Sequence, residues 1–333
     1  MTDPLDHLSE EERELLTEET FPDWVDPMLA TLVDDPFSSE DWIYERKLDG
    51  ERCLAFVDRD RIRLMSRNEK EITSTYPELA EALQASQVPP CVVDGEVVAF
   101  DGDVTSFQKL QGRMQIRDPD QARRSGIQVY LYLFDILHFG GSNVRALPLR
   151  RRKELLRRAI DFEDPLRFTP HRNQEGEEYY QEACASGWEG VIAKRAASSY
   201  QGTRSRDWLK FKCVGQQEFI VGGFTEPRGS RNGFGSLLIG YRRNGDLVYA
   251  GKVGTGYDEA TLARLRSRLD DLMTPQSPFD AGDPPAGAHW VAPEVVIEVG
   301  FTEWTEGGRL RHPRYLGVRR DKAADQVVRE TPS

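Results

Sequence analysis

The alternation of apolar and polar residues changes character twice along the chain. Residues 8–19 follow a helical period, and three prolines between residues 22 and 36 then keep the backbone extended. From Trp42 onward, short alternating runs predict strands. Near residues 214–217 the pattern changes again, to short strands separated by turn residues. These changes indicate an N-terminal segment followed by two domains.

The middle region predicts strands and helices in alternation. Strands are expected at 53–57 and 61–66, joined by a hairpin at 58–60, and at 91–100, 129–137, 190–195 and 208–213. Helices are expected at 77–85, 148–160 and 177–185. In the arginine-rich helix 148–160, the apolar stripe is formed by Leu149, Leu155, Leu156 and Ile160.

The last third of the chain predicts a small β-domain. Strands are expected at 218–224, 235–242, 247–253, 295–303 and 316–319, with a helix at 259–272 and a Pro/Gly loop at 274–287. Five or so strands with one helix in about 120 residues fit a Greek-key barrel of the oligonucleotide-binding (OB) type. The sequence therefore predicts an α+β protein with a domain boundary at about 213–216.

The net charge of −12 comes from one end of the chain. The first 40 residues hold 13 acids and a single base, Arg13, whereas the remaining 293 residues balance at 43 bases and 43 acids. We therefore expect residues 1–20 to be an acidic, mobile segment, residues 21–213 the first domain and residues 214–333 the second. The acidic total does not exclude a nucleic-acid ligand for the two domains.

Cysteine usage and hydropathy bear on the cellular setting. Cys53, Cys91, Cys184 and Cys213 are scattered without a C-x-x-C pair, which argues against a structural zinc site and a disulfide scaffold. No run of 18 apolar residues is present, and the N-terminus lacks the basic start and apolar stretch of a secretory signal. A reducing, cytoplasmic location is expected.

A lysine motif follows the first predicted strand of the middle region. It reads Lys47-Leu48-Asp49-Gly50-Glu51-Arg52, in a chain with only nine lysines. A lysine amine is a nucleophile only when neutral, so a reactive lysine needs a pocket that disfavours its protonation. The alternative is a solvated strand end and turn.

Two further motifs place acids beside apolar strands. Asp94 and Glu96 interrupt a β-rich run, where acids are costly to bury unless they meet a metal, a base or a sugar hydroxyl. An exposed turn is the alternative. Glu189 and Lys194 end the segment EGVIAK and would lie on opposite faces of a regular strand, unless Gly190 bends the chain. An edge strand with charged ends would give the same pattern.

Two basic runs have the pattern of strands. A period of two puts Lys210 and Lys212 on one face, opposite Leu209 and Phe211, and neighbouring like charges favour a shared anion. The run 309–322 carries embedded apolar residues, which favours a folded strand with a phosphate-seeking face over a solvated tail.

Together these motifs resemble a known family. K-x-D-G-x-R, D-G-E, E-G-x-x-x-K, W-L-K-x-K and R-x-D-K occur in this order from Lys47 to Lys322, as in the ATP-dependent DNA ligases of the covalent nucleotidyltransferase superfamily. The compact ligase module of bacterial and archaeal end-joining systems is the most similar. The resemblance implies an adenylation domain with antiparallel sheets, followed by a C-terminal OB-fold β-barrel.

The resemblance also implies roles for individual residues. Lys47 would be adenylated by ATP, Phe134 would stack on the purine, and Arg319, Asp321 and Lys322 would orient the leaving pyrophosphate. Mg²⁺ or Mn²⁺ would be held by Glu189 and Glu96. The residues expected to bind the nucleotide are Glu45, Asp49, Gly50, Arg52, Arg67, Glu96, Phe134, Lys194, Lys210, Lys212, Arg319 and Lys322.

The implied reaction passes adenylate from Lys47 to the 5′-phosphate of nicked or broken duplex DNA, where a 3′-hydroxyl displaces it. Lys194, Lys210 and Lys212 would crowd Lys47 with positive charge and so free its amine. The barrel would close over ATP for the first step. The expected partners are the DNA break, a Ku-type end binder and a separate polymerase; we expect a monomer, associated with the nucleoid and not with a membrane.

Other functions fit part of the pattern. An RNA ligase and a GTP-using mRNA-capping enzyme share the superfamily, but W-L-K-x-K together with R-x-D-K favours a DNA ligase. An NAD-dependent ligase is disfavoured because the four-cysteine zinc site is missing and the chain is short. A non-catalytic nucleic-acid-binding barrel protein would not need Lys47.

Overall fold

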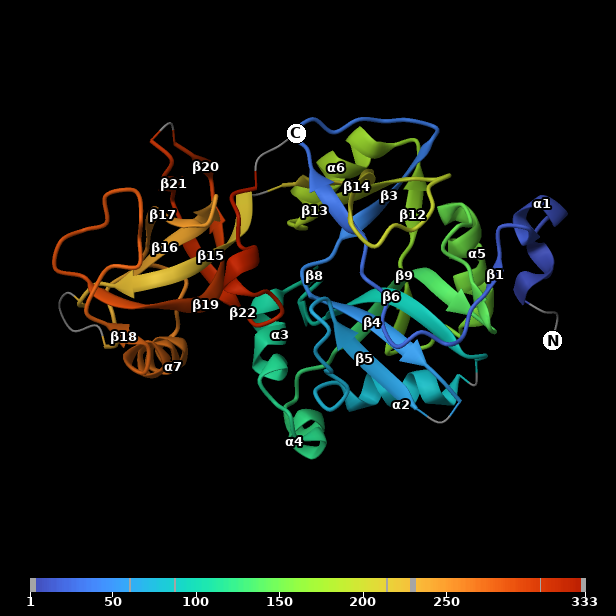
Figure 1. Cartoon of the computed structure of the whole chain (residues 1–333), viewed down its shortest axis with the longest axis horizontal. Coiled ribbons are helices and arrows are strands. Elements are labelled where there is room, and N and C mark those ends of the chain that lie inside the picture. The colour runs from blue at the N-terminus through green and yellow to red at the C-terminus, as the bar shows by residue number, and fades with distance from the viewer. Residues whose placement is uncertain are drawn as a thin grey trace. The chain divides into compact units, whose positions relative to one another are not determined.

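The computed structural model describes residues 4–59, 61–86, 88–213, 215–227, 232–305 and 307–330 (Figure 1). Asp60, in the predicted hairpin, and Val214, at the predicted boundary, lie outside these ranges. Contacts within the chain define two compact units, one up to residue 213 and one from 214 to 331. Each unit has a hydrophobic core of its own.

Two sheets form the framework of the first unit. The larger has the strand order β1-β10-β9-β6-β4-β5, with β11 parallel to β9, and the smaller has the order β12-β3-β13-β14-β2. The strands of the larger sheet are β1 (Thr17–Glu18), β4 (Glu51–Val57), β5 (Ile62–Ser66), β6 (Cys91–Val98), β9 (Tyr130–Phe139), β10 (Ser142–Asn143) and β11 (Leu166–Phe168). Those of the smaller sheet are β2 (Leu29–Leu32), β3 (Trp42–Lys47), β12 (His171–Asn173), β13 (Gly190–Arg195) and β14 (Arg204–Lys212).

Helices cover one face of each sheet in this unit. Leucines of α2 (Pro77–Ala85), α3 (Phe107–Met114) and α5 (Leu149–Ala159) share a core with the larger sheet. On the smaller sheet, α6 (Gly176–Ala185) packs Tyr179 and Ala183 against the strands. The remaining elements are α1 (Glu10–Arg13), α4 (Pro119–Arg124), a 3₁₀ turn (Pro4–His7), and the hairpin of β7 (Phe100–Asp101) and β8 (Val104–Thr105). The opposite faces of the two sheets carry the charged motifs.

The second unit is a half-barrel with one long helix. Its strand order is β17-β16-β15-β19-β18, and β22 pairs with β19. The strands are β15 (Gly215–Phe224), β16 (Leu237–Arg243), β17 (Asp246–Val253), β18 (Met273–Thr274), β19 (His289–Phe301), β20 (Glu303–Trp304), β21 (Leu310–Arg311) and β22 (Arg314–Arg319). Helix α7 (Glu259–Asp270) buries Leu262, Leu265 and Leu269 in the core, and a 3₁₀ turn (Ala324–Gln326) follows β22. The α+β fold with an OB-like second domain is confirmed.

Most predicted elements after Trp42 are present, including all three helices of the middle region. Helices α3 and α4 are additional: they are short and largely polar, and they begin at side-chain caps, where Ser106 and Asp118 accept hydrogen bonds from backbone N–H groups. The predicted interruption at Asp94 and Glu96 is wrong, because β6 continues through both residues.

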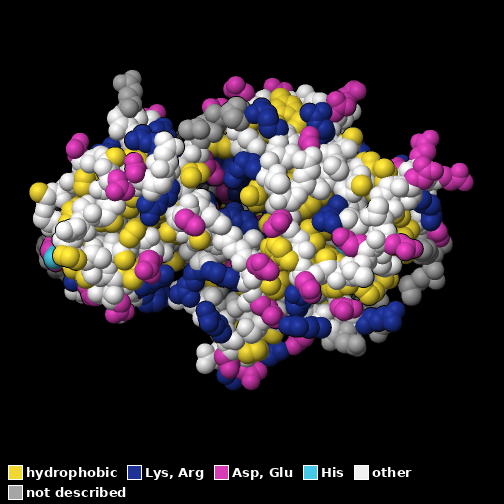
Figure 2. Space-filling model, in the orientation of Figure 1, with side chains coloured by type: hydrophobic (Ala, Val, Ile, Leu, Met, Phe, Trp, Pro, Cys, Tyr) yellow, Lys and Arg dark blue, Asp and Glu magenta, His cyan; other side chains and the backbone are white. Residues whose placement is uncertain are grey.

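Residues 4–20, for which the sequence predicts a mobile acidic segment, pack against the first unit. Leu8 is buried in the core of the first unit, and β1 pairs with β10. The helical period extends only over α1, whose Glu12 accepts a 2.6 Å hydrogen bond from Arg151 of α5. Acidic side chains gather over α1 in Figure 2, and elsewhere on this face acids and bases are interspersed. A buried leucine and ion pairs to arginine therefore anchor the segment.

A disulfide joins Cys184, in α6, to Cys213, directly after β14. The scattered cysteines did not predict it; α6 packs on β13, the neighbour of β14, and so brings together two cysteines 29 residues apart. Cys53 and Cys91 are buried thiols. Within the described ranges, none of the helices is long and apolar enough to cross a membrane.

Candidate active site

One face of the smaller sheet collects the charged residues of three motifs. Residues directly opposite each other in an antiparallel pair share a face. Lys47 and Lys212 both lie opposite Gly190, and Glu45 and Lys210 both lie opposite Ile192. The predicted placement of Lys210 and Lys212 on one face is confirmed, and β3 adds Glu45 and Lys47 to that face.

Lys47, at the end of β3, forms an ion pair with Glu189. Gly190 makes this possible: its φ is 150°, and a Cβ atom there would lie 1.9 Å from the carbonyl oxygen of Phe211, so a side chain would not fit. The bend brings Glu189 to the face that Lys194 occupies. The expected crowding of Lys47 by lysines is therefore incomplete, because a carboxylate in contact with the amine favours its charged form.

Glu45 is buried between two lysines. Its carboxylate lies 2.5 Å from Nζ of Lys153 and 2.6 Å from Nζ of Lys194. Burial alone would raise the pKa of Glu45, but the two ammonium groups outweigh it and lower the pKa below its ordinary value. Burial also lowers the pKa of Lys194 to about 8, although the Glu45 carboxylate opposes this shift. Burial thus brings the pKa of Lys194 well below that of an ordinary lysine.

Helix α5 connects the two sheets through consecutive cations that no motif predicts. Arg152 donates to Asp135 of β9 at 2.7 Å, and Lys153 donates to Glu45 of β3. Both cations are buried. A signal was present in the sequence: Lys153 lies four residues after Leu149, within the apolar stripe of the helix, where a charge needs a buried partner.

The larger sheet contributes a second buried pair. Arg52 donates two hydrogen bonds to Asp94, at 2.5 and 2.6 Å, and the hydroxyl of Tyr200 also donates to Asp94 at 2.6 Å. Burial alone would lower the pKa of Arg52, but Asp94 outweighs it and raises the pKa. Arg52 lies opposite Glu96 across β4 and β6. Asp94 is therefore an internal partner of Arg52 and not part of an exposed turn.

The two motif-bearing faces meet at Phe134 of β9. Nζ of Lys194, from the smaller sheet, lies 4.1 Å from the centroid of the Phe134 ring and 4.0 Å from that of Trp208. The guanidinium of Arg52 lies 4.7 Å from the Phe134 ring. The indole N–H of Trp208 is buried without a hydrogen-bond partner among the described residues. The structure therefore brings Phe134, Arg52 and Lys194 into one cluster.

Asp49 and Gly50 shape the turn that follows Lys47. Asp49 accepts a 3.0 Å hydrogen bond from the backbone N–H of Phe107, at the start of α3, and donates its own N–H to Thr105. A Cβ atom on Gly50 would lie 2.2 Å from the carbonyl oxygen of Val97. Arg67 lies in the turn after β5, and no hydrogen bond or ion pair described for the chain joins it to the cluster.

The carboxylates present suit a metal that arrives with a ligand. Among the described residues, no group of three or more His, Cys, Asp or Glu side chains could hold a metal ion. Mg²⁺ in proteins is often bound by only one or two carboxylates together with substrate phosphates. Glu189 and Glu96 would provide that number of oxygen donors, so their role as metal ligands stays a prediction.

The remaining predicted site residues lie together in the second unit. Arg319, at the end of β22, pairs with Glu298 at 2.9 Å and with Asp321 at 2.6 Å. Burial alone would lower the pKa of Arg319, but Asp321 and Glu298 outweigh it and raise the pKa. Lys322 pairs with Glu218 at 3.0 Å.

Two family models match the chain, one for each unit. The model "ATP dependent DNA ligase domain" matches residues 27–212, and "ATP dependent DNA ligase C terminal region" matches residues 230–322. The first match contains the Lys47 cluster, and the second contains the pairs formed by Arg319 and Lys322.

Individual relatives agree with this match. The multifunctional non-homologous end joining protein LigD of Pseudomonas aeruginosa is 37% identical over 322 residues, which are 94% of this chain and 37% of the relative. LigD of Mycobacterium tuberculosis is 37% identical over 91% of this chain and 40% of its own length. The chain thus spans about two fifths of these relatives. A solved structure, "mycobacterial DNA ligase D complexed with ATP and MES", has 36% identity and a TM-score of 0.66, covering 92% of this chain and 98% of the other. The chain belongs to the ATP-dependent DNA ligase family.

Proposed function

We propose that this protein uses ATP to seal breaks with a 5′-phosphate and a 3′-hydroxyl in duplex DNA, through an adenylate on Lys47. The observation that carries this proposal is the single sheet face that holds Lys47, Lys210 and Lys212, with Glu189 in contact with Lys47. A nucleophile beside a cluster of fixed cations suits phosphoryl transfer, where positioning and electrostatic stabilisation provide most of the catalysis.

In the first step, the Lys47 amine must leave its ion pair with Glu189 and lose its proton to solvent. It then attacks the α-phosphate of ATP; a nitrogen–phosphorus bond forms, and the bond to the leaving pyrophosphate breaks. Lys210 and Lys212 lie on the same face, where they can bind the phosphates as charge develops. Mg²⁺, held by Glu189 and Glu96, would offset the charge of the triphosphate. The adenylate passes to the 5′-phosphate, and the 3′-hydroxyl displaces AMP.

A role in end joining is the second part of the proposal. Relatives that match over nearly the whole chain are named as multifunctional end-joining proteins, and a solved relative is described as complexed with ATP. By this likeness, the DNA substrate is a broken or nicked duplex, and the partners are a Ku-type end binder and a polymerase. Since the chain spans about two fifths of the LigD relatives, these partners would be separate proteins or domains.

Label transfer tests the proposal directly. The protein is incubated with Mg²⁺ and ATP or GTP labelled on the α-phosphate, or with NAD labelled in its adenylate, and is then given a nicked duplex. We expect label on the protein from ATP alone, and its loss as the nick is sealed. Label from GTP would instead support a capping-type enzyme, and label from NAD an NAD-dependent ligase. No label from any of the three would contradict the catalytic proposal.

A further inference from the structure

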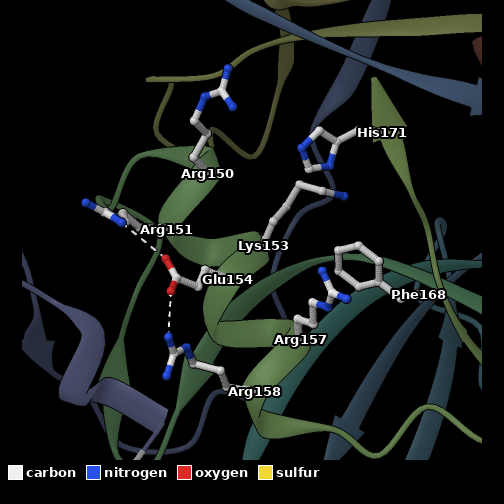
Figure 3. A pocket seen from close by; sticks show the side chains of 8 residues that line it. All are labelled: Arg150, Arg151, Lys153, Glu154, Arg157, Arg158, Phe168 and His171. Atoms are coloured by element: carbon white, nitrogen blue, oxygen red, sulfur yellow. Dashed lines mark hydrogen bonds and ion pairs between the residues drawn. The ribbon is translucent and has the colours of Figure 1, made fainter. Parts of the chain in front are cut away.

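A basic pocket lies along α5 in the first unit, lined by the side chains shown in Figure 3. Its volume is about 660 Å³, and its lining includes five cations but a single carboxylate, Glu154. Only Lys153 belongs both to this pocket and to the Glu45 network described above. An excess of positive charge in a concave site is typical of anion recognition.

The carboxylate of Glu154 forms ion pairs with two of these five cations. Glu154 accepts hydrogen bonds from Arg151 at 3.1 Å and from Arg158 at 2.8 Å, as the dashed lines in Figure 3 show. Arg150 donates to the neutral amide of Asn173, and Arg157 has no carboxylate partner among the described residues. Two exposed guanidinium groups at the pocket are therefore not neutralised by a neighbouring acid.

The wall of the pocket offers one further polar group. Nδ1 of His171 is buried without a hydrogen-bond partner among the described residues. Burial and the nearby charge of Lys153 lower the pKa of His171 to about 4, so its ring is neutral at pH 7. Phe168 forms an apolar side of the pocket, with Nζ of Lys153 lying 4.7 Å from its ring centroid.

We propose that this pocket binds the phosphate groups of an anionic ligand, supplied either by a free polyphosphate or by a nucleic-acid strand. Guanidinium groups bind phosphate through paired, charge-assisted hydrogen bonds, and Arg150 and Arg157 are placed to make them. The residues that line this pocket do not include Lys47, Lys210 or Lys212, so it is an addition to the proposed ligase site and does not rest on it.

The acidic N-terminal segment modulates this site. Glu12 lies 2.6 Å from Nε of Arg151 and contributes a second carboxylate to that cation. Its negative charge opposes an incoming phosphate. Glu12→Gln removes that charge while keeping the shape of the side chain, and it should strengthen phosphate binding.

Calorimetry with tripolyphosphate tests the pocket. Arg150→Gln/Arg157→Gln removes two cationic hydrogen-bond donors, and we expect affinity to fall about tenfold or more. Two variants serve as controls: Arg117→Gln/Arg124→Gln removes equal charge from exposed positions elsewhere, and Lys210→Ala/Lys212→Ala removes the proposed nucleotide-phosphate ligands. Binding at the pocket should persist in both. Two results would overturn the proposal. One is that Arg117→Gln/Arg124→Gln weakens tripolyphosphate binding as much as Arg150→Gln/Arg157→Gln does. The other is that Lys210→Ala/Lys212→Ala no longer binds tripolyphosphate at all.

A second arm identifies the source of the phosphate. A 5′-phosphorylated 12-nucleotide single strand is titrated at several salt concentrations, with and without tripolyphosphate as a competitor. If a strand is the ligand, the pocket variant should lower the salt dependence of its binding by about 0.7 for each phosphate that the protein no longer neutralises. If the variant affects tripolyphosphate alone, the ligand is a free anion. Neither measurement depends on nick sealing, so failure of the ligase proposal would leave both interpretable.

Discussion

The two units treat the positive charges of their motifs differently. In the first unit, lysines from three strands share one sheet face, and Lys153 and Lys194 divide a single carboxylate, Glu45. In the second unit, by contrast, one cation, Arg319, forms ion pairs with two carboxylates, Glu298 and Asp321. The first cluster therefore gathers several cations on one sheet face, an arrangement that suits a polyanion, whereas Arg319 is neutralised by its own neighbours.

We infer from this difference that the cations on the lysine face act mainly in ligand binding, whereas Arg319 acts mainly in stabilising the fold. A buried cation between carboxylates is costly to remove, because the acids are left unpaired. A cation on a face rich in cations can instead change partner when phosphate arrives. The comparison predicts that charge removal in the first unit affects chemistry most, and that its effect in the second unit depends on the residue.

The largest effect is expected at Lys47. Lys47→Arg keeps a positive charge for Glu189 but offers no nucleophilic amine, so transfer of label from ATP to the protein should fall to background. Sealing of a nick that already carries adenylate should continue. Lys252→Ala, at an exposed lysine of the second unit, is the matched control and should label normally. A labelled Lys47→Arg protein would show that the nucleophile is another residue.

Substitutions of Arg319 and Lys322 should distinguish a residue that stabilises the second unit from a residue that takes part in the reaction. Arg319→Ala removes the cation that Glu298 and Asp321 share, and we expect unfolding of that unit to become easier by about 3–5 kcal/mol. Among the described residues, Lys322 is paired with one carboxylate, Glu218. Lys322→Ala should therefore fold normally and lower adenylation of Lys47 on the order of 10²-fold.

Urea unfolding and two activity assays check these expectations. Sealing of a pre-adenylated nick by Lys322→Ala should be affected much less than its adenylation. Equal loss in both assays would mean that Lys322 serves DNA binding or folding. In that case the family-based role in pyrophosphate release would be wrong.

Much of the fold could be predicted because alternating strands and amphipathic helices leave a periodic pattern. The prediction of β13 agrees with the structure at both ends, as does that of α2. The N-terminal segment could not be predicted in this way. Its attachment depends on Leu8 and on the pairing of Glu12 with Arg151, contacts to residues far away in the sequence. Composition alone therefore favoured a mobile segment.

The candidate site was predictable where charges interrupt apolar strands, as at Lys210 and Lys212. It was not predictable where charges lie on an arginine-rich helix, because most charges on such a helix are solvated. Arg152 and Lys153 differ from their neighbours only in the partners they meet, Asp135 and Glu45. Those partners lie on other elements, so the distinction exists only in the folded protein.

Lys153 tests whether α5 supports the nucleotide site. Lys153→Met leaves Glu45 with Lys194 as its lysine partner, and we expect the free energy of unfolding to fall by about 3 kcal/mol, the lower end for a broken buried pair. Adding Glu45→Gln removes the carboxylate charge that Lys153 had helped to balance and should restore part of the loss. Arg158→Gln, on the exposed side of α5, is the control. A loss no greater than that of the control would show that the Glu45 pair contributes little.

The smallest predicted effect is a pH dependence set by Lys194. Burial lowers the pKa of this lysine from 10.5 to about 8. Bound phosphate favours the charged ammonium, so ATP affinity should be highest below pH 8 and fall as pH rises through that value. Between pH 8 and 10.5 the unfolded chain holds this proton and the folded chain does not, so this group's contribution to the free energy of unfolding rises over the same range.

ATP binding can be measured from pH 7 to pH 9.5 in Lys47→Ala protein, which forms no adenylate, and we expect it to weaken about tenfold. Adding Lys194→Arg keeps the charge and should flatten the profile. The same fall in both proteins would assign the titration to another group.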